Sequence, residues 1–290
     1  MKKNDKNIGN LLYAKNLKGK IIFIRHGETN YNSDFSKKGF KIKGDLKYID
    51  GHLNATGERQ AINSAGKFKS LYIEDVYVSP LFRALQSATL IFKNHPNKNK
   101  IKIHVHPLLT EVVSSVNNFT WNIEATKKIF NMNSEIKVDW TIFENEFKTI
   151  EEQNFFYLNY IDLLSDSKAQ EIKKKLYESY GTDKIKTSVG ELGKIIVDLH
   201  MKRIESLDHL FQRAIDFKNF LKEKYKNSLN DSNKKIFIIS HSCFGQMFTT
   251  KECYNKKHIE DYPKDCCEMN NCEELLLPFN KTKKENEYEF

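Results

Sequence analysis

The sequence has few cysteines and prolines, very few arginines and no long hydrophobic run. Its 290 residues include five cysteines and five prolines, and no apolar run approaches the ~20 residues that a transmembrane helix requires. The N-terminal residues are polar and lack the continuous apolar segment of a secretory signal. We therefore expect a cytoplasmic protein that neither spans nor binds a membrane.

The cysteines do not suit a disulfide framework. They are odd in number, and all lie in the last quarter of the chain: Cys243, Cys253, Cys266, Cys267 and Cys272. No pair has the two-residue gap of a zinc knuckle. Free thiols in a reducing compartment explain this pattern more simply than a metal site at Cys266, Cys267 and Cys272.

The net charge of +9 comes almost entirely from lysine. A positive chain favours an anionic partner, either a phosphorylated molecule or a nucleic acid. The lysines are scattered, and few aromatic residues lie between them, so a solvated surface is a better interpretation than a nucleic-acid stripe. Arginine holds phosphate with a planar fork that lysine lacks, which makes the positions of the five arginines informative. They are Arg25, Arg59, Arg83, Arg203 and Arg213.

Short apolar runs alternate with helical patterns along most of the chain. Most of these runs do not alternate with polar residues, which is typical of strands buried on both faces. A helix is expected to start near Thr56, a suitable N-cap, and another near Pro80, because proline suits a first turn. The alternation predicts a three-layer α/β/α sandwich with a mostly parallel sheet. Its strands are expected at residues 21–24, 76–78, 101–105, 236–239 and 275–277.

Residues 112–202 interrupt this alternation. They contain helical patterns at 141–160 and 170–179 but no convincing strand. We interpret them as a helical insertion that caps the site. The insertion lies within one domain that covers residues 18–290 and follows a polar N-terminal extension, residues 1–17.

The strongest chemical signal comes directly after the first predicted strand, in the sequence Arg25-His26-Gly27-Glu28-Thr29. In open α/β sheets ligands bind at the carboxyl ends of the strands, which is where Arg25 and His26 fall. A neutral imidazole can attack phosphorus and form a phosphohistidine, which divides one difficult displacement into two easier ones. Arg25 can neutralise phosphate oxygens, and Gly27 permits close approach of the backbone. The alternative is a core histidine beside a surface arginine, and three further segments argue against it.

These segments together resemble the motifs of the histidine phosphatase superfamily, also called the phosphoglycerate mutase-like family. The first is Arg25-His26-Gly27-Glu28-Thr29 with Asn32, and the second is Asp50 followed by Leu53-Asn54-Ala55-Thr56-Gly57-Glu58-Arg59. The third is Ser79-Pro80-Leu81-Phe82-Arg83-Ala84-Leu85-Gln86-Ser87, and the fourth is the strand at 236–239 that leads through Ser240 into His241-Ser242. The resemblance covers residues 20–111 and 203–248.

The resemblance implies a role for each matched residue. His26 is the nucleophile, His241 is the second catalytic histidine, and Arg25 and Arg83 bind the phosphoryl group. Two histidines and two arginines would supply the charge stabilisation that other enzymes obtain from Mg²⁺. We therefore expect catalysis without a metal or another cofactor.

Glu111 matches the family's general acid, because it follows the strand expected at 101–105. A carboxyl group at this place can protonate the leaving alkoxide. The family continues from this glutamate to a glycine, an aromatic residue and a second glutamate, whereas this chain continues with Val112-Val113-Ser114-Ser115. Glu28 is the alternative acid, although its place in the first motif favours a role in orienting the loop.

Four polar residues carry less weight. Asn32 is expected either to donate to the bound phosphate or to serve only in a turn. Ser242 offers its hydroxyl or its amide to the phosphate. His104 and His106 alternate at the end of a predicted strand, and we expect them at the surface rather than in a site.

Hydrolysis of a phosphate monoester through phospho-His26 is the function that these residues predict. The substrate would be a phosphorylated small molecule or a phosphoprotein. The nearest alternative is a phosphoglycerate mutase primed by 2,3-bisphosphoglycerate, which returns the phosphate to a second hydroxyl. Another is a family member that only binds phosphate or acts as a scaffold, although binding alone does not require the nucleophile. Because dimers are common in the family, a homodimer is an open alternative.

Arginine distinguishes the phosphatase from the mutase. The mutases of the resembling family use an extra arginine between the first and second motifs and an adjacent pair after the general acid. This chain has no arginine between His26 and Arg59 and none between Arg83 and Arg203. Lysines would hold a carboxylate less selectively, as point charges, so the sequence favours the phosphatase. The lysines that could replace the arginines are Lys37, Lys41, Lys43, Lys127 and Lys128.

Overall fold

The computed structural model describes residues 20–133, 135–198, 203–226, 234–249, 269–278, 280–281 and 288–289. The polar extension at residues 1–17 lies outside these ranges, as do Cys253, Cys266 and Cys267. Within them, no helix combines the length and the apolar character that crossing a membrane would require.

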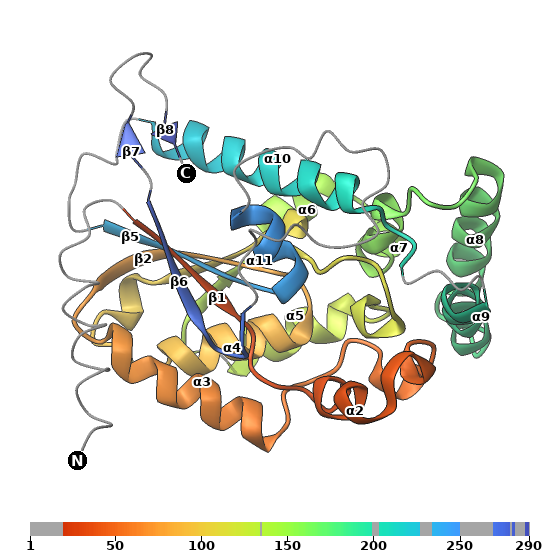
Figure 1. Ribbon diagram of the computed structural model, residues 1–290, viewed down its shortest axis with the longest axis horizontal. Helices are drawn as coiled ribbons and strands as arrows, with labels where there is room; N and C mark the ends of the chain where they lie inside the picture. Colours follow the sequence, from red (N-terminus) through yellow and green to blue (C-terminus); the bar gives the residue numbers. More distant parts are fainter. Residues whose placement is uncertain are drawn as a thin grey trace.

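A six-stranded sheet runs through the centre of the molecule (Figure 1), in the order β4-β3-β2-β5-β1-β6. Neighbouring strands are parallel, except that β6 is antiparallel to β1. The five predicted runs all form strands of this sheet, which confirms the mostly parallel arrangement. The strands are β1 (Lys20–Arg25), β2 (Tyr72–Val78), β3 (Lys102–Val105), β4 (Lys137–Asp139), β5 (Lys234–Ser240) and β6 (Glu274–Pro278).

Helices cover both faces of the sheet (Figure 1). They are α2 (Asn30–Lys38), α3 (Ala55–Phe68), α4 (Phe82–Phe92), α5 (Ile123–Asn133), α6 (Thr141–Glu146), α7 (Ile150–Asn154), α8 (Asp166–Ser179), α9 (Ile185–Asp198), α10 (Leu207–Tyr225) and α11 (Ser242–Thr249). Short 3₁₀ turns include η1 (Gly39–Ile42), η2 (Leu46–Tyr48), η4 (Pro107–Leu109), η5 (Val116–Asn118) and η6 (Phe156–Tyr160). A separate pair of short strands, β7 (Asn280–Lys281) and β8 (Tyr288–Glu289), is antiparallel.

The central strands are apolar along their length because each face of the sheet packs on its own core. On β1, Ile22 and Ile24 join the core that contains α3 and α4, whereas Ile21 and Phe23 join the core that contains α10 and α11. Successive side chains of a strand point to opposite faces, so a continuous apolar run fills both cores. The three-layer α/β/α sandwich predicted from the sequence is therefore confirmed.

Two helix starts differ from the prediction by one or two residues. The side chain of Asn54, and not Thr56, accepts from the Gly57 amide and caps α3. Helix α4 begins at Phe82 rather than at Pro80. Its N-cap residue, Leu81, has no side-chain hydrogen bond to the backbone of the helix. A carboxylate oxygen of Asp50 accepts from the Phe82 amide at 2.8 Å instead. Capping by a distant residue cannot be read from local sequence.

The segment 112–202 is mainly helical, as predicted, but it also supplies a strand. Strand β4 extends the sheet at its edge beside β3, although no strand was expected there. The helix expected at 141–160 is divided into α6, α7 and η6. Thr149 and Glu152 form a capping box that starts α7, so the helix restarts instead of continuing.

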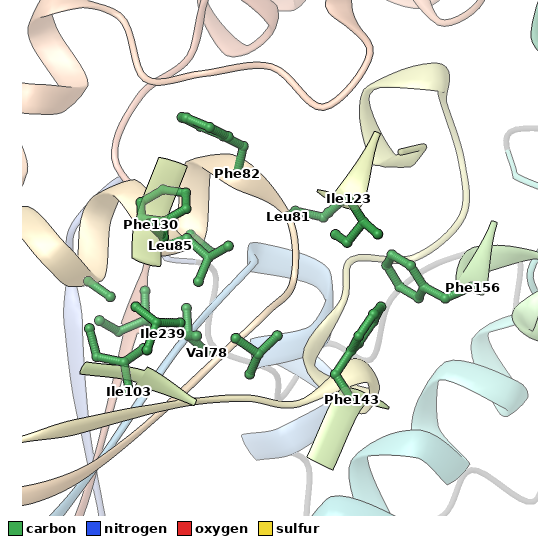
Figure 2. Close-up of a cluster of buried hydrophobic side chains, with 14 of the residues drawn as sticks. Val78, Leu81, Phe82, Leu85, Ile103, Ile123, Phe130, Phe143, Phe156 and Ile239 are labelled. Carbon is green, nitrogen blue, oxygen red and sulfur yellow. The ribbon is translucent and has the colours of Figure 1, made fainter. Parts of the chain in front are cut away.

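Side chains of the inserted segment share a core with the sheet. Figure 2 shows Phe143 and Phe156 beside Leu81 and beside Val78 of β2, in one continuous apolar cluster. Fully burying a side chain of this size contributes about 1.5–3 kcal/mol. Helices α8 and α9 lie at the end of the molecule farthest from the sheet (Figure 1), and their buried side chains belong to the same cluster. Helix α9 packs closely on the segment between η1 and η2. A Cβ on Gly44 of that segment would lie 3.1 Å from the carbonyl oxygen of Gly193 on α9.

Candidate active site

The parallel pairing of β1 and β5 brings two of the predicted residues together. Arg25 is in register with Ser240, and the His26 amide donates to the Ser240 carbonyl at 2.9 Å. His26 and His241 therefore follow neighbouring strands at the same edge of the sheet. Their ring centroids are 5.0 Å apart, edge to face.

The hydrogen bonds of His26 define its tautomer. Its Nδ1 lies 2.7 Å from the Gly27 carbonyl oxygen, which can only accept, so Nδ1 carries the hydrogen. The Nε2 atom then holds a lone pair, and the Arg83 Nε donates to it at 3.2 Å. Burial, reinforced by the charges of Arg83 and Arg25, holds the pKa of His26 well below its usual value. The ring is therefore neutral, as a nucleophile must be.

The loop after β1 is held by a backbone-to-backbone contact. A Cβ on Gly27 would lie 2.6 Å from the carbonyl oxygen of Gly57 in the first turn of α3. The Gly27 amide donates to the Ser87 hydroxyl of α4 at 2.9 Å. Gly27 was expected to permit close approach of the backbone, and the segment that approaches in the structure is the backbone of α3. A side chain at this position would push α3 away from the nucleophile loop.

Arg83 is the largest fully buried side chain among the described residues. Its Nη1 donates to the Asn117 carbonyl and its Nη2 donates to the Asn118 side-chain oxygen, both at 2.8 Å. Burial lowers the pKa of Arg83 to about 10, so the guanidinium stays charged at neutral pH. The turn η5 therefore fixes the orientation of a cation that contacts His26.

Asp50 lies close enough to Arg83 to act on its charge. Burial raises the pKa of Asp50 to about 7, against the opposing effects of the Phe82 amide and Arg83. Its backbone has φ = 42°, in the left-handed region that non-glycine residues rarely adopt. Asp50 thus links the start of α4 to Arg83.

His241 lies behind His26 rather than on the cavity surface. It is fully buried, its Nε2 is 2.8 Å from the Ser79 hydroxyl, and its Nδ1 has no partner among the described residues. Burial, together with the charges of Arg83, His26 and Arg25, holds the pKa of His241 well below its usual value. A second neutral imidazole therefore lies against His26, and its Nδ1 has no partner among the described residues.

A cavity of about 360 Å³ opens over these groups. Six of the seven predicted site residues line it, and His241 is the exception. The lining residues are Arg25, His26, Tyr31, Asn32, Phe35, Phe40, Lys43, Arg83, Glu111, Val112, Ser114, Ser115, Asn117, Asn118, Arg203, Ser242 and Cys243. A phosphate at the bottom would contact two arginines and the nucleophile.

Glu111 faces the cavity, but backbone amides hold it. One carboxylate oxygen accepts from the Val112 and Phe244 amides at 2.9 and 3.2 Å, and the other accepts from the Cys243 amide at 3.2 Å. The carboxylate therefore occupies the N-terminal end of α11. Glu28 is instead bound to the Asn54 side chain at 2.8 Å and is not among the lining residues. Of the two acids considered, Glu111 has access to a ligand.

Asn32 and Ser242 have different surroundings. Asn32 forms a capping box with Thr29 at the start of α2, in which its side-chain oxygen accepts from the Thr29 amide at 3.0 Å. Its Nδ2 group remains as the donor for a ligand. Ser242 is the first residue of α11 and lines the cavity beside Glu111.

The prediction that His104 and His106 lie at the surface is wrong. They are 7% and 4% exposed. His104 lies between two carboxylates, with Asp75 and Asp139 each 3.1 Å from a ring nitrogen. Asp75, His104 and Asp139 come from the adjacent strands β2, β3 and β4. The two carboxylates compensate for the burial of the ring. This group lies outside the cavity.

Two cationic residues of the cavity were not predicted. Lys43 was considered only as a substitute in a mutase, and Arg203 only as the end of the insertion. Both line the cavity. The sequence offered one signal for Arg203. Arginine is scarce, and three of the five arginines in the chain line this cavity. The lining residues Asn117 and Asn118, which hold Arg83, carried no recognisable signal.

Comparisons with known proteins agree with the motifs. Residues 21–122 match the model of the histidine phosphatase superfamily (branch 1), in agreement with the resemblance seen in the motifs. Fructose-2,6-bisphosphatase TIGAR B of Danio rerio is 35% identical over 91 residues, 31% of this chain and 33% of that protein. Fructose-2,6-bisphosphatase TIGAR of Xenopus laevis is 36% identical over 92 residues, 31% of this chain and 30% of that protein. The chain therefore aligns with about a third of the length of these relatives.

Solved structures resemble the chain more distantly. The phosphoglycerate mutase from Bacillus anthracis str. Sterne is 14% identical, with 81% of this chain and 80% of that chain covered and a TM-score of 0.41. The ecdysone phosphate phosphatase of Bombix mori, in complex with tungstate, is 15% identical, with 89% and 88% covered and a TM-score of 0.41.

Proposed function

We propose that this protein is a phosphatase that hydrolyses a phosphate monoester through a phosphohistidine on His26. The observation that carries the proposal is the tautomer of His26. Its Nδ1 hydrogen is engaged by the Gly27 carbonyl, so the lone pair is on Nε2, where it accepts from the Arg83 Nε in the cavity that Arg25, His26 and Arg83 line. The match of residues 21–122 to the histidine phosphatase superfamily supports the same chemistry.

In the first step Nε2 attacks phosphorus, the bond from phosphorus to the ester oxygen breaks, and a phosphohistidine forms. The leaving alkoxide takes a proton from Glu111. In the second step water attacks the phosphohistidine and returns its proton to Glu111, which releases orthophosphate and free His26. Arg25 and Arg83 balance the charge on the phosphoryl oxygens in both steps, and we expect no metal to be required.

Glu111 can act as the acid only if its surroundings change on binding. Protonation of one carboxylate oxygen of Glu111 makes that oxygen a weaker acceptor for the amides that now donate to it. A phosphate placed over α11 would compete for the Cys243 and Phe244 amides. We therefore expect Glu111 to exchange these contacts for the ester oxygen when substrate binds.

The test is to trap the phosphoenzyme. Labelled substrate is mixed with enzyme, and the reaction is stopped in alkali, because phosphohistidine is labile in acid. We expect label on the wild type and none on His26→Ala, whose turnover should be abolished. Activity should survive EDTA, and vanadate should inhibit it. A His26→Ala variant that keeps more than a few per cent of turnover would refute the assignment.

The substrate screen should include glycerate phosphates, sugar phosphates, phosphopeptides and p-nitrophenyl phosphate. Fructose 2,6-bisphosphate belongs in it because the names of two relatives specify that substrate. Strict dependence on added Mg²⁺ or Zn²⁺ would contradict the proposed mechanism.

Mutase activity is the second candidate, and the cavity gives one reason to test it. Lys43 and Arg203 add two cations beyond those that bind the phosphoryl group, and a mutase must also hold a carboxylate. We expect interconversion of 3- and 2-phosphoglycerate to be at least about 100-fold slower than in a true mutase, about 2.7 kcal/mol of transition-state stabilisation. Fast interconversion that depends on 2,3-bisphosphoglycerate would favour the mutase instead.

A further inference from the structure

Three aromatic side chains line the cavity instead of a core. Tyr31 and Phe35 lie one turn apart on α2, a helix with no buried residue, and their ring centroids are 5.5 Å apart and stacked. Phe40 follows on η1, with its ring edge-on to Phe35 at 5.7 Å. Phe40 is 59% exposed although it borders the catalytic cavity. We call these three residues the aromatic wall.

The local sequence holds the aromatic wall in place. The capping box of Thr29 and Asn32 starts α2. Gly39 ends it with φ = 63°, in the left-handed region, which turns the chain so that Phe40 returns onto Phe35. The Lys43 ammonium lies 5.0 Å from the centre of the Phe40 ring. The contacts with Phe35 and Lys43 therefore hold the Phe40 ring in position although it is exposed.

Exposed aromatic surface beside a ligand cavity is typical of a binding surface, because water solvates it poorly. The aromatic wall contributes no group that the phosphoryl transfer requires. Most of the remaining lining residues are polar or charged, so the aromatic residues of the cavity all come from one segment, residues 31–40. A ring that enters the cavity could stack on Phe35 or Phe40 in the offset or edge-on geometries that aromatic pairs prefer.

We infer that the alcohol part of the substrate carries an aromatic or similarly flat apolar ring. This ring packs on the aromatic wall, while the phosphoryl group lies against Arg25, His26 and Arg83. The inference rests on the proposed function for the identity of the cavity. The inference goes beyond the proposed function because it names the class of phosphate ester that the cavity selects.

Binding of phosphonates tests the inference without turnover. Benzylphosphonate and methylphosphonate carry the same charged group, and only the first carries a ring. By calorimetry we expect the wild type to prefer benzylphosphonate, and Phe40→Ala to reduce that preference about five- to tenfold. Phe40→Tyr keeps the ring and should keep the preference. Met132→Ala is the matched control, because Met132 is 71% exposed on α5 and does not line the cavity.

Turnover of benzyl phosphate and sn-glycerol 3-phosphate separates the two proposals. Both are alkyl esters, so the ratio of variant to wild type reports the ring contact. Phe40→Ala should lower kcat/KM about five- to tenfold for benzyl phosphate and less than about twofold for glycerol phosphate. Equal losses on both esters, or equal binding of the two phosphonates by the wild type, would overturn the aromatic wall as a binding surface. Ring-selective binding without turnover of any ester would retain it and refute the phosphatase.

Discussion

His26 and His241 are surrounded by positive charge, whereas His104 is surrounded by negative charge. The first two lie at the carboxyl edge of the sheet beside Arg25 and Arg83. His104 lies within the sheet layer between two carboxylates, at 3.1 Å on each side. All three rings are buried. Burial alone therefore does not decide what a histidine does in this protein.

The neighbouring charges decide it. A carboxylate lies at each ring nitrogen of His104, which makes this residue a structural cross-link between strands. A neutral imidazole whose Nδ1 carries the hydrogen has its lone pair on Nε2. In His26 this lone pair accepts from the Arg83 Nε, and we expect attack on phosphorus to replace that contact. One side chain thus serves stability in one region and chemistry in the other.

The largest effect is expected when the cation beside the nucleophile is removed. Arg83→Met keeps a long apolar stem but loses the guanidinium, so we expect kcat/KM to fall by about 10²–10³. Arg83→Lys should fall less, because it keeps the charge and loses the bidentate fork. Steady-state kinetics on p-nitrophenyl phosphate would show both. Unchanged kinetics in Arg83→Met would mean that Arg83 does not contact the phosphoryl group.

Stability should depend on the other region. His104→Leu removes the imidazole contact of Asp75 and of Asp139, and we expect the free energy of unfolding to fall by about 2 kcal/mol. His106→Leu is the matched control. Burial lowers the pKa of His106 to about 3, and its ring packs on Phe217 and Phe220. Its loss should cost about 1 kcal/mol or less. Urea denaturation measures both, and kcat of the folded variants should stay near that of the wild type.

A pH titration should separate the histidines by their charge. At pH 5.5 an unperturbed histidine, with a pKa of about 6.5, is about 90% protonated. His26 and His241 have pKa values held well below that, so they should remain neutral there. Folded-state stability from their neutral forms is present above pH 6.5 and is lost as the pH falls toward the lowered values. NMR of the protein with labelled histidine would follow the protonation of each ring, and the resonance that is missing in His26→Ala would be assigned to His26. A midpoint near 6.5 for His26 would contradict it.

The smallest effect should come from the carboxylates of His104 taken singly. Asp139→Asn keeps a hydrogen-bond acceptor at the more exposed of the two, so we expect a loss of about 1 kcal/mol or less. Asp75→Asn should cost slightly more, because Asp75 also accepts from the Tyr225 hydroxyl at 2.7 Å. Denaturation at pH 7 would rank the two. The reverse order would mean that Tyr225 adds nothing to the network.

Local sequence was sufficient for elements that are apolar throughout or that carry a dense motif. The central strands are such elements, and so are the residues directly after β1. Strand β4 has three residues and one buried side chain, Val138, so no run of apolar residues marks it. Its place is set by pairing with β3, which the sequence does not display.

Residues that depend on long-range register were missed or misplaced. His104 was expected at the surface because its compensation comes from Asp75 and Asp139 on two neighbouring strands. Arg203 reaches the cavity only because the chain returns from the insertion at that point. Phe40 was not distinguished from core aromatics, since its exposure follows from the turn at Gly39. These features require the tertiary arrangement, not only the residue types.

The place of β5 in the sheet has a consequence for how the chain becomes active during synthesis. Strands β1 and β2 carry the nucleophile loop and lead into α4, but they do not touch as strands, because β5 lies between them. The sheet cannot close until residue 240 has left the ribosome. Until then the inner edges of β1 and β2 are unpaired and their apolar faces are uncovered, a state that favours aggregation and slow folding. The first 122 residues therefore contain most of the motif but do not contain a folding unit.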